Sequence, residues 1–229
     1  MGTGQEGRVM VFLDSFTFMA THLQFLLAKT GEHVVISLSA IAVALVIALP
    51  LGTWLGHIHK GNFLAVSLSN LGRALPTLAV IAILIGVIGI GFRNVFTTLV
   101  IICIPPILTN TYLAIDQVEP DLVRAGRGMG LTETQILRRV ELPMGIPLMF
   151  AGIRTAAIYV IGSATIGGVV GGGGLGDPIL QQASYGLAGV IAAALWVAAL
   201  AVLADLILYG VQRAVTPRNL RARHPQPVI

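Results

Sequence analysis

VEPDLVRAGRGMGLTETQILRRVELP, residues Val118–Pro143, is the one long polar stretch that interrupts an otherwise apolar chain. The 229 residues are 55% hydrophobic and 10% charged, and the mean hydropathy is +0.88. A soluble fold of this size could not bury so much apolar surface. The composition therefore predicts an integral membrane protein in which this polar stretch lies outside the bilayer.

Five stretches around it are long and apolar enough to cross a membrane as helices. A spanning helix needs about 20 mostly apolar residues, because the hydrocarbon layer is roughly 30 Å thick and offers no partners to backbone groups. The predicted fold is therefore all-α, with one transmembrane domain over residues 31–211. Its five predicted spans cover about residues 34–56, 63–92, 94–115, 147–170 and 187–211.

The segment before the first span, residues 1–30, mixes apolar and polar residues and lacks the A-x-A-like exit of a signal peptide. Its polar members include Asp14, His22, Gln24 and Lys29. We expect an amphipathic interfacial helix over Val9–Thr30 that lies along the external membrane surface. A sixth span is the alternative.

The placement of lysine and arginine predicts an external amino end and a cytoplasmic carboxyl end, because basic residues accumulate on the cytoplasmic side. Of the 14 lysines and arginines, three would then lie outside, namely Arg8, Lys29 and Arg93. The others would lie inside, including those of the basic tail, residues 212–229. This bias explains the sequence pI of about 9.7 without a nucleic-acid partner.

The polar stretch predicts a helical hairpin within a cytoplasmic loop over residues 116–146. Pro120 suits the first turn of a helix, and the glycines at 126, 128 and 130 would loosen or end it. Thr132 and Gln135 then form a T-x-x-Q capping box that opens a second helix. The hairpin would be compact and would stand outside the membrane.

The second helix of this hairpin is amphipathic. Its apolar side carries Ile136, Leu137 and Val140, and the opposite side carries Arg138 and Arg139. We expect Pro143 and Pro147 to end the segment before the fourth span. An apolar face with basic edges, which the bilayer does not cover, points to a protein partner.

The spacing in this loop resembles the signature of permease subunits in binding-protein-dependent ABC importers: Glu-Ala-Ala, three residues, Gly, nine residues, Ile-x-Leu-Pro. Here these positions hold Arg124-Ala125-Gly126, Gly130 and Val140-Glu141-Leu142-Pro143. The resemblance implies a coupling helix that inserts into a groove on an ATP-binding subunit. Arg124 replaces the Glu of the family and Gly126 replaces its second Ala, so the charge at this contact is reversed.

Several stretches elsewhere narrow the resemblance to permeases for osmoprotectants, which import glycine betaine, choline, carnitine or proline. It implies a five-helix type I importer core in a prokaryotic plasma membrane. Import of methionine or another amino acid on the same fold is the alternative. The stretches are Pro50-Leu51-Gly52, Arg73-Ala74-Leu75-Pro76-Thr77-Leu78-Ala79, Pro106-Ile107-Leu108-Thr109-Asn110-Thr111, Gly128-Met129-Gly130, Ala151-Gly152-Ile153-Arg154-Thr155-Ala156 and Gly173-Gly174-Leu175-Gly176.

The implied partners are an ABC ATP-binding subunit, a second permease copy or sister permease, an external or periplasmic substrate-binding protein, and membrane lipid. The chain has no G-x-x-x-x-G-K-[ST] loop, so we expect ATP and Mg²⁺ on the ATP-binding subunit and neither cofactor nor metal here. The residues expected at the ATPase contact are Arg124, Ala125, Gly126, Arg127, Gly130, Leu131 and Thr132, with Leu142 and Pro143 supporting the loop.

Asp205 is the one carboxylate well inside a predicted span, where an unpartnered charge costs about 2.5 to 3.5 kcal/mol. We expect it to pair with Arg73 or Arg154, or to be exposed at the membrane interface. Asn110 is expected to pack, to bond across helices or to line the solute path. The external residues Gly173, Gly174, Leu175 and Gly176 form either part of a gate or a simple flexible turn.

An intramembrane enzyme is the competing class of function. The five histidines, His22, His33, His57, His59 and His224, form no H-E-x-x-H motif, and Ser163 has no G-x-S-x-G context. We therefore expect no catalytic residue and a subunit that transports.

Overall fold

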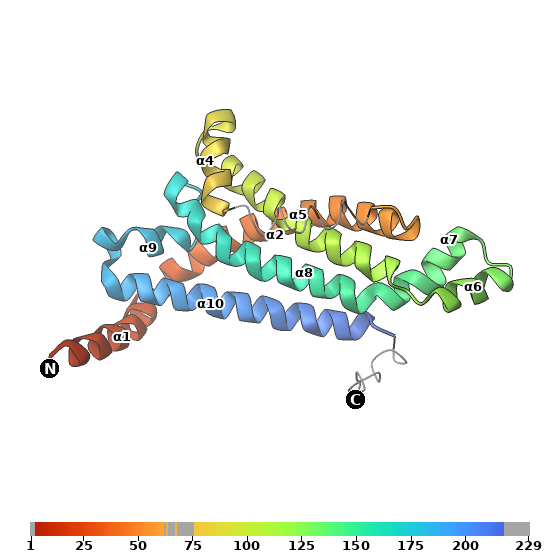
Figure 1. The fold of residues 1–229 in the computed structure, drawn as a ribbon. Helices are drawn as coiled ribbons and strands as arrows, with labels where there is room; N and C mark the ends of the chain where they lie inside the picture. Colours follow the sequence, from red (N-terminus) through yellow and green to blue (C-terminus); the bar gives the residue numbers. More distant parts are fainter. Residues whose placement is uncertain (1–2, 62, 64–66, 68–75, 218–229) are drawn as a thin grey trace. The chain divides into compact units, whose positions relative to one another are not determined.

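The computed structural model describes residues 3–61, 63, 67 and 76–217, and in this part of the chain all regular secondary structure is helical (Figure 1). In chain order the helices are α1 (Thr3–Thr21), α2 (Leu23–His57), α4 (Thr77–Ile88), α5 (Phe92–Asp116), α6 (Pro120–Gly128), α7 (Glu133–Ile136), the π-helix η1 (Leu137–Glu141), α8 (Leu142–Ala164), the 3-10 helix η2 (Thr165–Val170), α9 (Gly176–Leu180) and α10 (Gln182–Val215).

Among the described residues, four helical segments are long and apolar enough to cross a membrane: α2, α5, Glu133–Val170 and α10. They correspond to four of the five predicted spans. The remaining span, over residues 63–92, is described mainly in α4, which has 12 residues. Residues 68–75 of it, and with them Arg73, lie outside the described residues, as does the tail beyond Pro217.

The chain divides into two compact units. One consists of Met1–Val43, Leu75–Cys103 and Ala157–Ala204, and the other of Ala44–Ala74, Ile104–Ala156 and Asp205–Ile229. The first is called unit 1 below and the second unit 2. Each long helix contributes one part to unit 1 and another to unit 2, so the predicted transmembrane domain contains both.

Unit 1 has an apolar core of Leu26, Ile161, Leu175 and Val197. Its α2 begins at Leu23, before the span predicted from about residue 34, and a break at His22 divides the helix expected over Val9–Thr30. The charge of Lys29 made this segment look unlike a span, but Lys29 Nζ donates to Asp177 Oδ2 at 2.8 Å. Further along α2, His33 Nε2 lies 2.9 Å from the carbonyl oxygen of Ile161, so each of these side chains has a partner that offsets the cost of its burial.

Unit 2 is built on close contacts between helix backbones. A Cβ atom added to either glycine of the α2 pair would lie within 2.9 Å of a carbonyl oxygen of α5, and one added to either glycine of the α8 pair would lie within 2.8 Å of one. In this unit α5 therefore packs between α2 and α8, and small residues allow the approach. The α2 glycines are Gly52 and Gly56, and the α8 glycines are Gly145 and Gly152.

The second helix of the predicted hairpin does not end at Pro143 or Pro147, contrary to the prediction. It continues as η1, α8 and η2 as far as Val170. In η1 the N–H of Leu142 donates to the carbonyl of Leu137, five residues earlier. A proline has no N–H and crowds the carbonyl four residues before it, and the wider π turn directly before Pro143 relieves this conflict.

Candidate functional site

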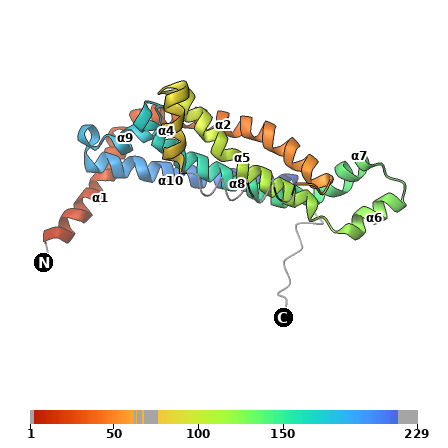
Figure 2. The ribbon, with the colours of Figure 1, turned by 45° about the horizontal axis from the view of Figure 1, so that its top comes forward.

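The predicted hairpin is present and consists of α6, α7 and η1, residues 120–141. Its helices α6 and α7 lie side by side in both ribbon views (Figures 1 and 2). The turn between them needs Gly130, whose φ of 83° is a left-handed conformation that other residues rarely adopt. Thr132 then caps α7: its N–H donates to Gln135 Oε1 at 2.9 Å, and its hydroxyl accepts from the N–H of Gln135 at 3.4 Å. The predicted capping box is confirmed.

The hairpin has its own apolar core. Val123 of α6 and Ile136 of α7 are buried together with Val118, and Leu131, Val140 and Met144 pack against them. Gly126 faces this core too, so neither Gly126 nor Leu131 lies on the exposed face with the other predicted contact residues. A Cβ atom at position 126 would make ordinary contacts, 3.5 Å from Leu131 and 3.6 Å from Ile136.

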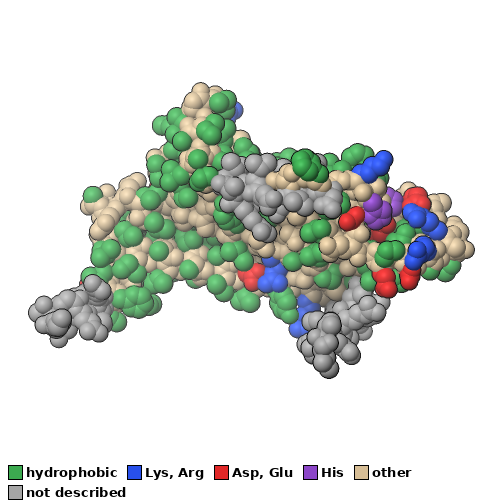
Figure 3. Space-filling view, in the orientation of Figure 1, with side chains coloured by type: hydrophobic (Ala, Val, Ile, Leu, Met, Phe, Trp, Pro, Cys, Tyr) green, Lys and Arg blue, Asp and Glu red, His purple; other side chains and the backbone are tan. Residues whose placement is uncertain are grey.

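The opposite face of the hairpin is exposed and charged. Arg124, Ala125 and Arg127 lie on it, and Thr132 is exposed beside them. Arg124 forms an ion pair with Asp121, in which both side chains are more than two-thirds exposed. In Figure 3 charged and histidine side chains gather over this hairpin. An exposed pair stabilises by at most about 1 kcal/mol, so this face is free to exchange its partners.

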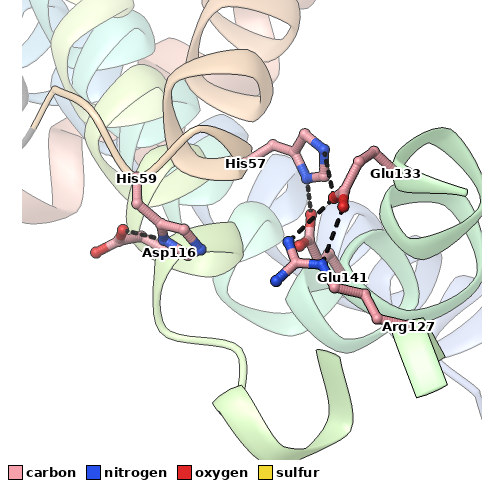
Figure 4. A network of polar contacts seen from close by, with 6 residues as sticks. All are labelled: His57, His59, Asp116, Arg127, Glu133 and Glu141. Atoms are coloured by element: carbon pink, nitrogen blue, oxygen red, sulfur yellow. Dashed lines mark hydrogen bonds and ion pairs between the residues drawn. The ribbon is translucent and has the colours of Figure 1, made fainter. Parts of the chain in front are cut away.

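A polar network joins the hairpin to the end of α2 (Figure 4). Arg127 donates to both carboxylate oxygens of Glu133, from Nε at 2.9 Å and from Nη2 at 3.1 Å. His57 lies between two carboxylates: Nε2 is 3.7 Å from Glu133 Oε2, and Nδ1 is 2.6 Å from Glu141 Oε2. The hydrogen bonds from Arg127 lower the pKa of Glu133.

The two ends of the His57–Glu141 contact are enclosed. The side chain of Glu141 is 2% exposed and that of His57 is 16% exposed. A second histidine near the end of α2 differs, because His59 bonds Asp116 at 2.8 Å while its own side chain is 55% exposed. A buried carboxylate needs a partner far more than an exposed one does. Of these two contacts near the end of α2, the one between His57 and Glu141 is therefore more costly to break than the one between His59 and Asp116.

The predicted partner of Asp205 is found within unit 2. Arg154 donates to both carboxylate oxygens of Asp205, at 2.7 and 2.8 Å, and its guanidinium carbon lies 5.1 Å from the centre of the Tyr209 ring. Gln212 adds a hydrogen bond to Arg154 at 3.3 Å. Pairing with Arg154 is confirmed. The contact is bidentate, which is the strong form of an arginine–carboxylate ion pair.

Among the described residues, Asn110 has no side-chain hydrogen bond to another helix. Its Nδ2 donates to the carbonyl oxygen of Pro106, one turn earlier in α5, at 2.8 Å. A Cβ atom added at Gly152 would lie 2.5 Å from Asn110 Cβ, so this side chain is part of the α5–α8 contact. Of the roles expected for Asn110, packing describes its surroundings.

The predicted external turn, Gly173–Gly176, is packed against α2 within unit 1. Gly174 donates its N–H to Glu32 Oε2 at 2.8 Å. Lys29 then bridges Glu32, at 2.9 Å, and Asp177, at 2.8 Å. One hydrogen bond, from Gly174 to Glu32, and one ion pair, between Lys29 and Asp177, therefore connect this turn to α2.

Comparison with known proteins identifies the family. Residues 44–221 match the family described as "Binding-protein-dependent transport system inner membrane component". The chain is 40% identical over 210 residues to the glycine betaine/carnitine/choline transport system permease protein OpuCB of Bacillus subtilis, covering 90% of this chain and 95% of that protein. The chain belongs to this family. It is a multi-pass membrane permease, and its function is transport.

Two further relatives agree. The permease is 38% identical over 209 residues to the choline transport system permease protein OpuBB of Bacillus subtilis, covering 89% of this chain and 94% of that one. It is 34% identical over 216 residues to the osmoprotectant import permease protein OsmW of Salmonella typhimurium, covering 91% and 100%.

The fold of the permease matches a solved importer. A chain of the inward-facing MetNI methionine ABC transporter aligns with a TM-score of 0.74 and 24% identity, covering 86% of this chain and 99% of that one. The predicted type I importer fold is thereby confirmed. At this identity the likeness concerns the fold and not the solute.

Sequence reasoning missed three residues of the permease's polar network: His57, Glu133 and Glu141. Glu141 offered a signal, because it is a carboxylate between apolar residues in the Val-Glu-Leu-Pro segment. His57 offered a weaker one, since it ends a long apolar helix. Their pairing across 84 residues could not be read from either position alone.

Proposed function

We propose that this permease imports osmoprotectants, namely glycine betaine, choline, carnitine or proline, in a complex driven by ATP hydrolysis. The observation that carries the proposal is the identity of 34–40% to relatives named for betaine, choline, carnitine and osmoprotectant transport. The likeness to the methionine transporter is 24% and supports the fold alone, so methionine is not favoured.

The proposed partner on the cytoplasmic side is an ABC ATP-binding subunit that carries ATP and Mg²⁺. It would dock on the exposed face of the hairpin, at Arg124, Ala125 and Arg127, near Gly130 and Thr132. The separate apolar core of the hairpin supports this role, because it keeps the shape of the face independent of the partner. Arg124 carries a positive charge where the family has Glu, so the receiving groove must accept a cation beside Asp121.

The other proposed partners are a second permease, identical or a sister chain, and an external substrate-binding protein. The solute path would lie where two permeases meet, since five helices rarely enclose a channel. A quaternary ammonium group is usually held by aromatic rings, yet this chain is 6% aromatic, so the strong solute site belongs on the binding protein. The amino end would be external and the carboxyl end cytoplasmic.

The transport proposal is tested by uptake in a bacterial strain that lacks its own osmoprotectant importers. The permease is expressed with its ATP-binding subunit and substrate-binding protein, and uptake of labelled glycine betaine, choline, carnitine, proline and methionine is measured. Uptake of at least one of the first four, abolished by removing the ATP-binding subunit, is expected. Uptake of methionine alone would overturn the assignment.

The docking proposal is tested at Ala125. Ala125→Trp places a bulky side chain on the exposed face, whereas Ala125→Ser changes its size little. The ATP-binding subunit should copurify with Ala125→Ser and be lost from Ala125→Trp, while both variants elute as folded permease. Full retention of the subunit by Ala125→Trp, together with normal uptake, would contradict docking at this face.

A further inference from the structure

We infer that His57 is a positioning residue for coupling, because it fastens the end of α2 to the α6–α7 hairpin through Glu141 and Glu133. The inference rests on the proposed docking of an ATP-binding subunit on this hairpin. It assigns the transmission of movement from hairpin to span to particular side chains.

The first argument is that few polar links join the hairpin to the helix end that it would move. Among the described residues, His57 is the one residue of α2 with a side-chain hydrogen bond or ion pair to residues 120–141. Both ring nitrogens are used, one toward Glu141 and the other toward Glu133. A planar ring held from two sides fixes direction as well as distance.

The second argument concerns the cost of separating these groups. Glu141 is enclosed, and its contact with His57 is 2.6 Å long, so a proton lies between the two atoms. Moving the hairpin without α2 would leave this carboxyl group buried without a partner, which is strongly unfavourable. The end of α2 must therefore follow the hairpin, or the hairpin must stay in place.

The third argument is the route that the network takes. Arg127 lies on the exposed face proposed for docking and donates hydrogen bonds to Glu133. Glu133 in turn lies beside His57, and His57 bonds Glu141. Glu141 belongs to the π-helix η1, directly before α8. Single π turns occur often at functional sites. The charged groups around His57 thus connect the proposed docking face, the π turn and a span.

The experiment uses the purified complete importer, with its ATP-binding subunit and binding protein, in proteoliposomes. Solute imported per ATP hydrolysed is measured for the unmodified complex and for His57→Ala, His57→Gln and His59→Asn. The last variant is the matched control. His59 lies just beyond the end of α2 and also bonds a carboxylate, but its side chain is exposed and its partner Asp116 lies outside the hairpin. Asn also tolerates the left-handed backbone of position 59.

We expect the His57→Ala complex to assemble and to hydrolyse ATP, while the amount of solute imported per ATP falls by about tenfold. A change of this size is within the range seen when residues between two coupled sites are replaced. His57→Gln keeps a donor for Glu141 and should recover part of the ratio. His59→Asn should leave it unchanged. An unchanged ratio in assembled His57→Ala complexes would overturn the inference.

A double variant keeps the test decisive if His57→Ala does not fold. In His57→Leu with Glu141→Leu both partners are apolar, so no buried charge is left unpaired. If this variant folds and still hydrolyses ATP with a low ratio, His57 positions the hairpin. If it restores the full ratio, the pair serves stability alone and the inference fails. Failure of the unmodified complex to bind an ATP-binding subunit would instead defeat the proposed function.

Discussion

The α6–α7 hairpin of unit 2 and the glycine turn at residues 171–176 of unit 1 are held in shape in different ways. Side chains hold the hairpin: a capping box, an apolar core and a histidine between two carboxylates. Close packing at its glycines holds the turn: an added Cβ atom would meet side chains at Gly172, Gly173 and Gly174 and the backbone of Thr165 at Gly176. A glycine-to-alanine substitution should therefore be tolerated in the core of the hairpin but not in the turn.

The largest effect is expected in the glycine turn, at Gly176. A Cβ atom there would lie 2.0 Å from the carbonyl oxygen of Thr165, a backbone atom that cannot turn aside. Gly176→Ala should lower the free energy of unfolding by about 3 kcal/mol or more, as severe overpacking does. Size-exclusion profiles and thermal unfolding in detergent measure it. Gly162→Ala is the control, because nothing lies within 4 Å of its added Cβ atom.

The next effect is expected at the buried end of the hairpin network. His57→Ala leaves Glu141 enclosed without its partner, and breaking a buried pair from one side costs about 3 kcal/mol. Thermal unfolding should show a clear drop for His57→Ala and a small one for His59→Asn, whose ring is exposed. Equal drops would mean that enclosure does not distinguish the two histidines.

A smaller effect is expected at the ion pairs of the glycine turn. Lys29 bridges Glu32 and Asp177, and its side chain is 20% exposed. Lys29→Met keeps the apolar stem and removes the charge, so two carboxylates lose a shared partner and we expect a loss of about 1–2 kcal/mol. A melting temperature equal to that of the unmodified permease would show that backbone packing alone fixes the turn.

The smallest effect is a gain within the hairpin. Gly126→Ala restores the residue that the family signature carries, and its methyl group would meet the hairpin core at ordinary contact distances. Alanine favours a helix over glycine by about 0.8–1 kcal/mol, so unfolding should shift upward. Solute uptake should remain normal, because position 126 faces inward. A lower melting temperature would show that the core has no room.

The same contrast explains how much of the molecule the sequence could predict. The spans and the hairpin could be predicted, because both depend on local sequence. The length of an apolar stretch indicates a span, and Thr132, Gln135 and Gly130 indicate the cap and the turn of the hairpin. The partner of Asp205 was accessible as well, since a charge within a span demands one. The start of α2 was not, because the partner of Lys29 at Asp177 is 148 residues away.

Other features depend on tertiary contact and left no local pattern. A proline normally interrupts a helix, so Pro143 argued for a helix end. The helix continues through it because a π turn precedes it. The glycine turn looked flexible because glycine permits many conformations, yet the same absence of side chains lets it pack tightly. The bond between His57 and Glu141 required two distant segments to meet.

The most direct test of the central claim labels the exposed face of the hairpin. Cys103 is the single cysteine of the chain and is buried, so Ala125→Cys supplies an accessible thiol for a maleimide reagent. Labelling is measured with the permease alone and in complex with its ATP-binding subunit. The account predicts rapid labelling of the permease alone and strong protection in the complex. Equal labelling rates in both states would contradict docking at this hairpin.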